Sequence, residues 1–313
     1  MTDITAVGEI LIDLTQSGVN EQGIPLFAAN PGGAPANLAV AAARLGASAA
    51  FVGKVGTDSY GTFLRNTLID NRVDVSGMVT DPRNRTTLAV VALDKQGERT
   101  FSFYRDPSAD VNLRADEISD EQLKNTKFLH FGSVSLTTDP ARTATLHAAK
   151  TAKHHGAVIS YDPNYRASLW PDEATAIERM LEPLPLVDVL KVSDEELPLL
   201  TGTDDLEEGS AILAGKGIRL VLVTLGANGS FYRFDGHTGH VPGVKCKVGD
   251  TNGAGDTFFG ATLAQLAKRG SLDALTVSDL EQIVAASNKA ASITTSRHGA
   301  IPAMPTYDEV FGD

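Results

Sequence analysis

One segment of the sequence has residues whose types and spacing suit phosphoryl transfer. Residues 248–261 read Val-Gly-Asp-Thr-Asn-Gly-Ala-Gly-Asp-Thr-Phe-Phe-Gly-Ala, which predicts a strand, a turn of small residues and then an apolar helix. The free N–H groups near Gly253, Ala254 and Gly255 would face outward at the positive end of that helix. They would form a cradle for phosphate oxygens and for the charge that develops on a phosphoryl group in transfer.

Asp256 would lie beside this cradle. A carboxylate there could accept the proton of a substrate hydroxyl while that oxygen attacks the terminal phosphorus of a nucleotide. A second interpretation stays open at this point. Asp256 could be a helix-capping carboxylate, with Gly253 and Gly255 only shaping the turn.

Another segment of small residues opens a second predicted helix, because residues 31–39 read Pro-Gly-Gly-Ala-Pro-Ala-Asn-Leu-Ala. The amide of Asn37 offers donors and an acceptor to neighbouring hydroxyl groups, and Gly32 and Gly33 would let a ligand lie against the backbone. The alternative is close packing of this helix on a sheet, with Asn37 bonded to local backbone groups.

Several common catalytic motifs do not occur in the sequence. It contains no G-x-x-x-x-G-K-[ST] loop, and residues 253–255 lack the third glycine of a G-x-G-x-x-G loop. An H-E-x-x-H pair and a G-x-S-x-G elbow are also missing, and His154 and His155 are expected at a solvated helix end. Readings as a P-loop, dinucleotide-binding or hydrolytic protein therefore have little support.

The elements that would position these residues alternate between helices and short apolar strands. The alternating segments are residues 34–45 and 49–52, 140–155 and 158–161, and 187–192 and 220–224. This alternation is typical of βαβ units around a parallel sheet, so the predicted fold class is α/β. Helical patterns return at 255–268 and 280–295, and a short strand predicted at 241–248 would extend the sheet in antiparallel fashion.

Two segments interrupt the alternation, and we expect them to form a small separate β layer. They are about residues 15–31 and 86–105, and the second predicts a hairpin around a turn at Lys95-Gln96-Gly97. This layer would project as a lid over one edge of the body. Exposed strand edges of a lid could pair with a second copy, which predicts a homodimer through the lids.

The overall composition restricts the partners and the compartment. The 313 residues contain 42% hydrophobic side chains and carry a formal net charge of −12, so long-range repulsion disfavours nucleic acid and anionic membrane surfaces. No apolar run approaches the roughly 20 residues needed to cross a bilayer. Cys246 is the single cysteine and no basic, apolar leader is seen at the start, so a cytoplasmic location is expected.

Taken together, the two small-residue segments resemble the signatures of the ribokinase-like, or PfkB, family of carbohydrate kinases. The first signature is matched by Gly32-Gly33, Asn37, Gly46 and Gly56, and the second by Asp250, Gly253-Ala254-Gly255 and Asp256. One departure is Thr262, where the family usually has an apolar residue, but it lies in the helix beyond the chemistry. The resemblance covers nearly the whole chain, so residues 1–313 are expected to form one domain of this family.

This resemblance implies a ribokinase-like three-layer α/β/α body with a mostly parallel central sheet and a small projecting β-sheet lid. It implies ATP and Mg²⁺ as cofactors and a sugar as substrate, with Asp256 as the base and Gly253, Ala254 and Gly255 as the anion hole. It also suggests a monovalent cation, K⁺, near Asp250.

The nucleotide site is likewise implied by the resemblance. Its expected residues are Thr224, Gly226, Asn228 and Gly229 in a turn after a core strand, Gly253 and Gly255 at the anion hole, Asn288 in a late helix, and Ser193. Ser193 replaces the asparagine of the family's N-x-x-E motif, whereas Glu196 keeps the acidic residue that organises Mg²⁺ through water.

The expected sugar site contains Asp13, Gly32, Gly33, Asn37 and Asp256 from the family pattern, with Phe101 and Phe103 on the lid and Arg166 after a core strand. The forms Gly-Gly-Ala-Pro-Ala-Asn and Asp-Pro-Asn-Tyr-Arg resemble fructokinases. Arg166 also fits kinases of 2-keto-3-deoxygluconate, in which an arginine can pair with the sugar-acid carboxylate, or it could form a structural ion pair. A fructokinase is the leading hypothesis. The alternative is a kinase of 2-keto-3-deoxygluconate or another sugar kinase of the PfkB type, and the third is a non-catalytic sugar-binding regulator.

Overall fold

A nine-stranded, mostly parallel sheet runs through the middle of the computed structural model, which describes residues 1–93 and 99–312. Its strand order is β13-β12-β11-β10-β9-β8-β1-β4-β5, and only the pairs β11–β12 and β12–β13 are antiparallel. The strands are β1 (Thr2–Val7), β4 (Ala49–Gly56), β5 (Val73–Asp81), β8 (Thr126–Gly132), β9 (Val158–Asp162), β10 (Val189–Ser193), β11 (Leu220–Thr224), β12 (Ser230–Phe234) and β13 (His237–Val241).

The central strands are buried on both faces and mostly apolar, as in a sheet that helices cover on both sides. In β11 the residues Leu220 to Val223 are all buried, and every residue of β4 is buried. The β-branched side chains of such strands fit a pleated surface that is packed from above and below. Local sequence and tertiary packing therefore favour the same strands.

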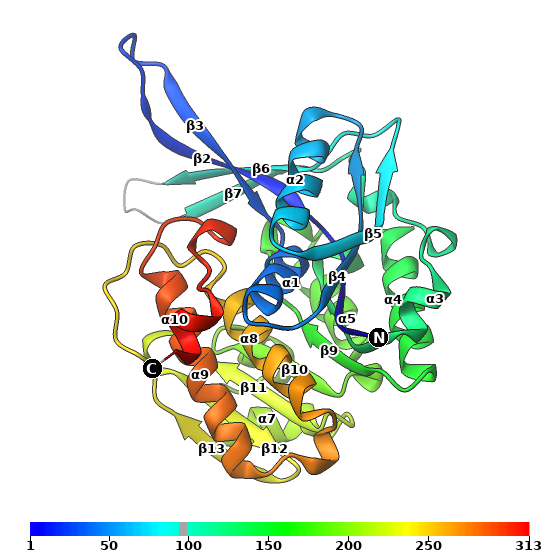
Figure 1. Ribbon diagram of the computed structural model, residues 1–313, viewed down its shortest axis with the longest axis vertical. Coiled ribbons are helices and arrows are strands. Elements are labelled where there is room, and N and C mark those ends of the chain that lie inside the picture. Colours follow the sequence, from blue (N-terminus) through cyan, green and yellow to red (C-terminus); the bar gives the residue numbers. More distant parts are fainter. Residues whose placement is uncertain (94–98, 313) are drawn as a thin grey trace.

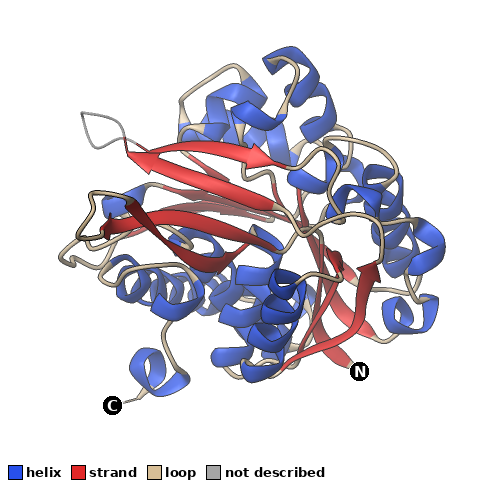
Figure 2. Ribbon diagram, turned by 90° about the horizontal axis from the view of Figure 1, so that it is seen from above, coloured by secondary structure: helices blue, strands red, loops and turns tan. Residues whose placement is uncertain are grey.

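Helices cover the two faces of this sheet (Figures 1 and 2). Apolar side chains of α1, α8, α9 and α10 pack together on one face, and those of α4, α5, α6 and α7 pack on the other. The helices are α1 (Ala34–Arg44), α2 (Ser59–Asp70), α3 (Asp120–Lys124), α4 (Ala141–His154), α5 (Glu173–Leu181), α6 (Glu196–Thr201), α7 (Leu206–Ala214), α8 (Ala254–Arg269), α9 (Val277–Thr295) and α10 (Tyr307–Phe311). This arrangement confirms the predicted three-layer body.

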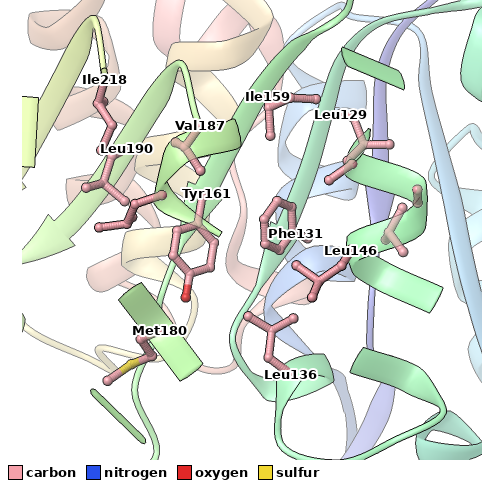
Figure 3. Close-up of a cluster of buried hydrophobic side chains, with 14 of the residues drawn as sticks. Leu129, Phe131, Leu136, Leu146, Ile159, Tyr161, Met180, Val187, Leu190 and Ile218 are labelled. Carbon is pink, nitrogen blue, oxygen red and sulfur yellow. The ribbon is translucent and has the colours of Figure 1, made fainter. Parts of the chain in front are cut away.

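The core on the second face is centred on a pair of aromatic rings (Figure 3). Phe131 in β8 stacks on Tyr161 in β9 with 4.8 Å between ring centroids, and both side chains are fully buried. Met180 of α5 and Leu146 of α4 belong to the same cluster. The packing fixes the carboxyl ends of β8 and β9, where polar residues begin.

A second, four-stranded sheet stands apart from the central one, which confirms the prediction of a separate β layer. Its order is β3-β2-β6-β7, with β2 and β6 parallel and the other pairs antiparallel. The strands are β2 (Leu11–Val19), β3 (Pro25–Gly32), β6 (Leu88–Leu93) and β7 (Arg99–Tyr104). The hairpin of β2 and β3, blue in Figure 1, projects beyond the body. The predicted turn at Lys95-Gln96-Gly97 lies outside the described residues.

The predicted strand at residues 241–248 is wrong. The strand in this region is β13, which ends at Val241, and residues 242–248 have no regular secondary structure. Pro242 has no N–H group to donate to a sheet. The backbone of Gly243 packs closely on the next turn, because a Cβ atom on Gly243 would lie 2.4 Å from the carbonyl oxygen of Ala227. The chain therefore leaves the sheet at this point.

Candidate active site

The carboxyl ends of the central strands and the amino ends of α1 and α8 surround a small pocket of about 70 Å³. Ligands of open α/β sheets bind at this edge, since the loops that follow parallel strands meet there. Glu9 follows β1, Asn164 follows β9, and Asn37 and Asp256 come from the first turns of α1 and α8. The predicted site residues that line this small pocket are Asp13, Gly33, Asn37, Phe103, Arg166, Gly253 and Asp256.

Asp256 is buried at this small pocket and is held by two amides. Asn37 Nδ2 donates a hydrogen bond to Asp256 Oδ2 at 2.8 Å, and Asn164 Nδ2 donates one to Oδ1 at 3.3 Å. Burial raises the pKa of Asp256 above its usual value, although the bond from Asn37 and the charges of Lys191 and Arg166 lower it. The carboxylate is therefore oriented and more basic than an exposed aspartate, as a general base requires.

The turn before α8 depends on the glycine at its helix cap. Gly253 has φ 72°, in the left-handed region, and a Cβ atom there would lie 2.8 Å from the Cβ of Ala300. Asn252 N–H donates to Asp250 Oδ1 at 2.8 Å, and Gly299 N–H donates to Asp250 Oδ2 at 3.1 Å. Asp250 thereby ties the turn to the loop before the C-terminal segment.

A buried ion pair lies beneath this turn. Lys191 Nζ is 3.0 Å from Asp162 Oδ2, and both side chains are almost fully buried. A Cβ atom on Gly255 would lie 3.2 Å from Lys191 Nζ, so the ammonium group is close to the start of α8. Burial lowers the pKa of Lys191, but the carboxylates of Asp162 and Glu196 outweigh it and raise the value, which keeps the positive charge in place.

The paired glycines before α1 make room for two acidic residues. A Cβ atom on Gly32 would lie 2.3 Å from Asp13 Oδ2, and one on Gly33, whose φ is 104°, would lie 2.6 Å from the carbonyl oxygen of Glu9. Gly33 lines the small pocket, whereas the missing side chain of Gly32 leaves space for the carboxylate of Asp13. Phe101 belongs to β7, and its side chain is outside the described part of the structure.

A large pocket of about 500 Å³ lies on the other side of the turn at residues 253–256. The predicted nucleotide-site residues that line it are Thr224, Gly226, Gly229, Gly255 and Asn288, together with Ala254 of the anion hole. Asn288 Oδ1 accepts a hydrogen bond from Ser230 Oγ at 2.6 Å, and its Nδ2 donates to the carbonyls of Val241 and Pro242. Asn288 therefore fixes the strand end that borders this large pocket.

Among the predicted residues whose side chains the structure describes, five line neither pocket: Gly32, Ser193, Glu196, Asn228 and Asp250. Glu196 accepts hydrogen bonds from the backbone N–H groups of Tyr165 at 2.7 Å and Ser193 at 2.8 Å, and Ser193 Oγ accepts the N–H of Glu196. These residues connect the loops after β9 and β10. The carbonyl of Asn228 contacts His240 Nε2 at 2.8 Å.

Several pocket residues were not predicted from the sequence. In the small pocket they include Glu9, Asn164, Asn252 and Ala300. The backbone of Asn164 has φ 46°, which is unusual for a residue other than glycine. The Asp-Pro-Asn sequence after a strand could have indicated a special turn at this position. In the large pocket, residues 243–246 form part of the wall, including Cys246.

In residues 1–93 and 99–312, no group of three or more His, Cys, Asp or Glu side chains is arranged to hold a metal ion. No helix in that part of the chain combines the length and apolar composition that a membrane crossing needs.

Comparison with known proteins gives consistent results along the chain. The model of the pfkB family carbohydrate kinases matches residues 1–307. Fructokinase-1 of Zea mays is 45% identical over 98% of this chain and 96% of its own. The fructokinase of Xylella fastidiosa with bound ATP superimposes with a TM-score of 0.91 at 34% identity, covering 98% of this chain and 96% of that chain. A double mutant of the Vibrio cholerae O395 fructokinase, in a form with bound fructose, ADP and potassium ion, gives a TM-score of 0.90 at 35% identity, covering 99% and 97%.

Proposed function

The chain belongs to the pfkB family of carbohydrate kinases, and on this premise we propose that it transfers the γ-phosphoryl group of MgATP to a hydroxymethyl group of fructose. The enzyme class, a phosphotransferase with an alcohol acceptor, follows from the family. Fructose is supported by the relatives in maize, Xylella and Vibrio, all fructokinases by name.

One observation carries the assignment of sites. The turn at residues 253–256 borders both pockets, with Gly253 and Asp256 on the small pocket and Ala254 and Gly255 on the large one. The small pocket would hold the sugar, and the large one the nucleotide. The N–H groups of the turn then stand where phosphoryl charge develops, and Asp256 stands on the side of the acceptor.

In the proposed reaction Asp256 accepts the proton of the attacking hydroxyl. Its hydrogen bonds from Asn37 and Asn164 hold the carboxylate in one orientation while the oxygen forms its bond to phosphorus and ADP leaves. Asp13 and Phe103 of the second sheet line the small pocket, so closure of this lid over the sugar would exclude water.

Mg²⁺ would supply charge neutralisation on the phosphates. Both oxygens of Glu196 already accept backbone N–H groups, which fits a contact to the ion through water better than direct coordination. The carboxylate oxygens of Asp250 likewise each accept an N–H group, so K⁺ near Asp250 would rely on neighbouring carbonyl oxygens.

Two further features belong to the proposal. The hairpin of β2 and β3 exposes Val19, Ile24, Leu26 and Phe27, an apolar surface that supports a homodimer through the lids. A cytoplasmic location is supported by the use of a single, free cysteine, Cys246.

The experiment is a panel of acceptors with MgATP: fructose, glucose, ribose, nucleosides and 2-keto-3-deoxygluconate. ADP release and product analysis by mass and NMR would identify both the sugar and the phosphorylated carbon. We expect selective turnover of fructose. A preference for the sugar acid would instead make Arg166, which lines the small pocket, a carboxylate clamp. Binding of a sugar without turnover of any member of the panel would support a regulator.

A further inference from the structure

Glu9 is a buried acidic residue that the proposed reaction does not use. It lies two residues after the end of β1, is 3% exposed and lines the small pocket. A carboxyl group in this position is expensive to bury unless its oxygens find hydrogen-bond partners.

Within residues 1–93 and 99–312, one of its two oxygens has such a partner and the other has none. Oε1 accepts the N–H of Ala34, the first residue of α1, at 3.1 Å. Oε2 is inaccessible to solvent and has no hydrogen-bond partner among the described residues. The same is true of Oδ1 of Asn37, one turn further along α1 and on the same small pocket. Two buried oxygens on residues of the small pocket therefore lack a hydrogen-bond partner within the described part of the chain, as acceptors kept for a ligand would.

Arg105, a buried cation whose charge acts on Glu9, is already engaged elsewhere. Arg105 donates from Nε to Asp110 at 2.7 Å, from Nη1 to Thr137 Oγ1 at 2.7 Å and from Nη2 to the carbonyl of Val134 at 3.0 Å. Glu9 consequently has no ion-pair partner in the described part of the chain. Burial raises its pKa to about 7, with Arg105 lowering the value and Asp110 raising it. Both forms of the Glu9 side chain can bond a sugar hydroxyl. The carboxylate accepts a hydrogen bond, and the carboxylic acid can also donate one.

We propose that Oε2 of Glu9 forms a hydrogen bond with a sugar hydroxyl other than the one that is phosphorylated, which makes Glu9 a specificity-determining residue. This inference rests on the proposed sugar site in the small pocket. Asp256 serves the reacting hydroxyl, whereas Glu9 approaches the pocket from the end of β1 and is bonded to the first residue of α1. A site built to bond a hydroxyl discriminates strongly against analogues that lack it, because the buried oxygen is then left unpaired.

The test combines Glu9→Gln with the monodeoxy analogues of fructose, using KM and kcat with MgATP as the readout. Glutamine keeps an oxygen for the Ala34 N–H and replaces the other oxygen with an amide. For fructose we expect KM to rise about tenfold with kcat within about threefold, the size of one lost hydrogen bond to a charged group. With the wild-type protein, one deoxy analogue should show a similar rise in KM relative to fructose. For that analogue, Glu9→Gln should raise KM little further. Glu121→Gln, on the exposed surface of α3, is the matched control and should change neither constant.

If Glu9→Gln raises KM equally for fructose and for every analogue, Glu9 only stabilises α1 and the inference is overturned. An unchanged KM for fructose would overturn it as well. If Glu9→Gln fails to fold, a crystal structure of the wild-type protein with fructose and a non-hydrolysable nucleotide decides. A sugar oxygen within about 3.2 Å of Oε2 supports the inference, and its absence contradicts it. A wild-type protein that turns over no sugar would refute the proposed function, whereas an active protein without this coupling would refute the role of Glu9 alone.

Discussion

Asn37 Nδ2 lies 2.8 Å from Asp256 Oδ2, although the two residues belong to helices at opposite ends of the chain. The contact is possible because α1 and α8 pack closely. A Cβ atom on Gly260 would lie 2.8 Å from both the Cβ of Ala41 and the carbonyl oxygen of Leu38. The two small-residue segments of the sequence therefore form one unit around the proposed base.

Asn37→Ala should shift the acid limb of the kcat profile to higher pH. Burial raises the pKa of Asp256 and the bond from Asn37 lowers it, so removing the amide raises the pKa further. The base is then protonated over a wider range, and activity is lost at a higher pH as acid is added. Near neutral pH we expect kcat to fall about tenfold or more, the effect of one hydrogen bond to a charged group. An acid limb that stays in place would argue against this coupling.

Lys191→Met should destabilise the protein by about 3–5 kcal/mol, because it leaves the buried carboxylate of Asp162 without its partner. Urea denaturation followed by circular dichroism gives this free energy of unfolding. The double variant Lys191→Met/Asp162→Asn removes both charges and should recover a large part of the loss. A double variant as unstable as the sum of the two single variants would show that the pair is not coupled.

Cys246 offers a direct probe of the proposed nucleotide site, because it is exposed, lines the large pocket and is the only cysteine in the sequence. N-ethylmaleimide should label the protein at this residue. MgATP at ten times its Kd should slow the labelling about tenfold, since only the free protein reacts. Cys246→Ser should take up no label. Labelling that is as fast with MgATP as without it would place the nucleotide elsewhere.

Phe27 lies at the apolar tip of the lid and is 47% exposed, so a charge at this position should affect the affinity of the proposed dimer. Phe27→Asp should weaken the proposed dimer about tenfold or more. In the dimer the Phe27 ring would be buried at the interface, and the substitution places a charge there instead. Sedimentation equilibrium over a range of concentrations measures the Kd. Gln22→Asp places the same charge on the same hairpin without removing apolar surface and should have a smaller effect. A wild-type protein that stays monomeric at high concentration would exclude this dimer.

The local sequence was sufficient for the elements that carry the proposed chemistry. The sequence predicts the small-residue turn before residue 254 and the helix after it. It also predicts a helix at residues 34–45, observed as α1 at 34–44, and the strand at 220–224. These elements combine a strong apolar period with glycines at their boundaries, so local preference and tertiary packing agree.

The residues that sequence analysis missed depend on contacts between distant parts of the chain. Glu9 resembles an ordinary polar residue after a strand until α1 covers it, and the Lys191–Asp162 pair requires the alignment of β9 and β10. Asn164 reaches Asp256 only because α8 begins opposite the loop after β9. Such three-dimensional neighbourhoods leave no periodic pattern in the sequence.

The most direct measurement compares Asp256→Asn with the wild-type protein in fructose binding and in turnover. The substitution keeps the size of the side chain and one oxygen, which can accept the bond from either Asn37 or Asn164, but it removes the base. We expect the Kd for fructose from titration calorimetry to stay within about threefold and kcat to fall by a factor of about 10²–10⁴. Turnover within a few-fold of the wild-type rate would show that Asp256 is not the base.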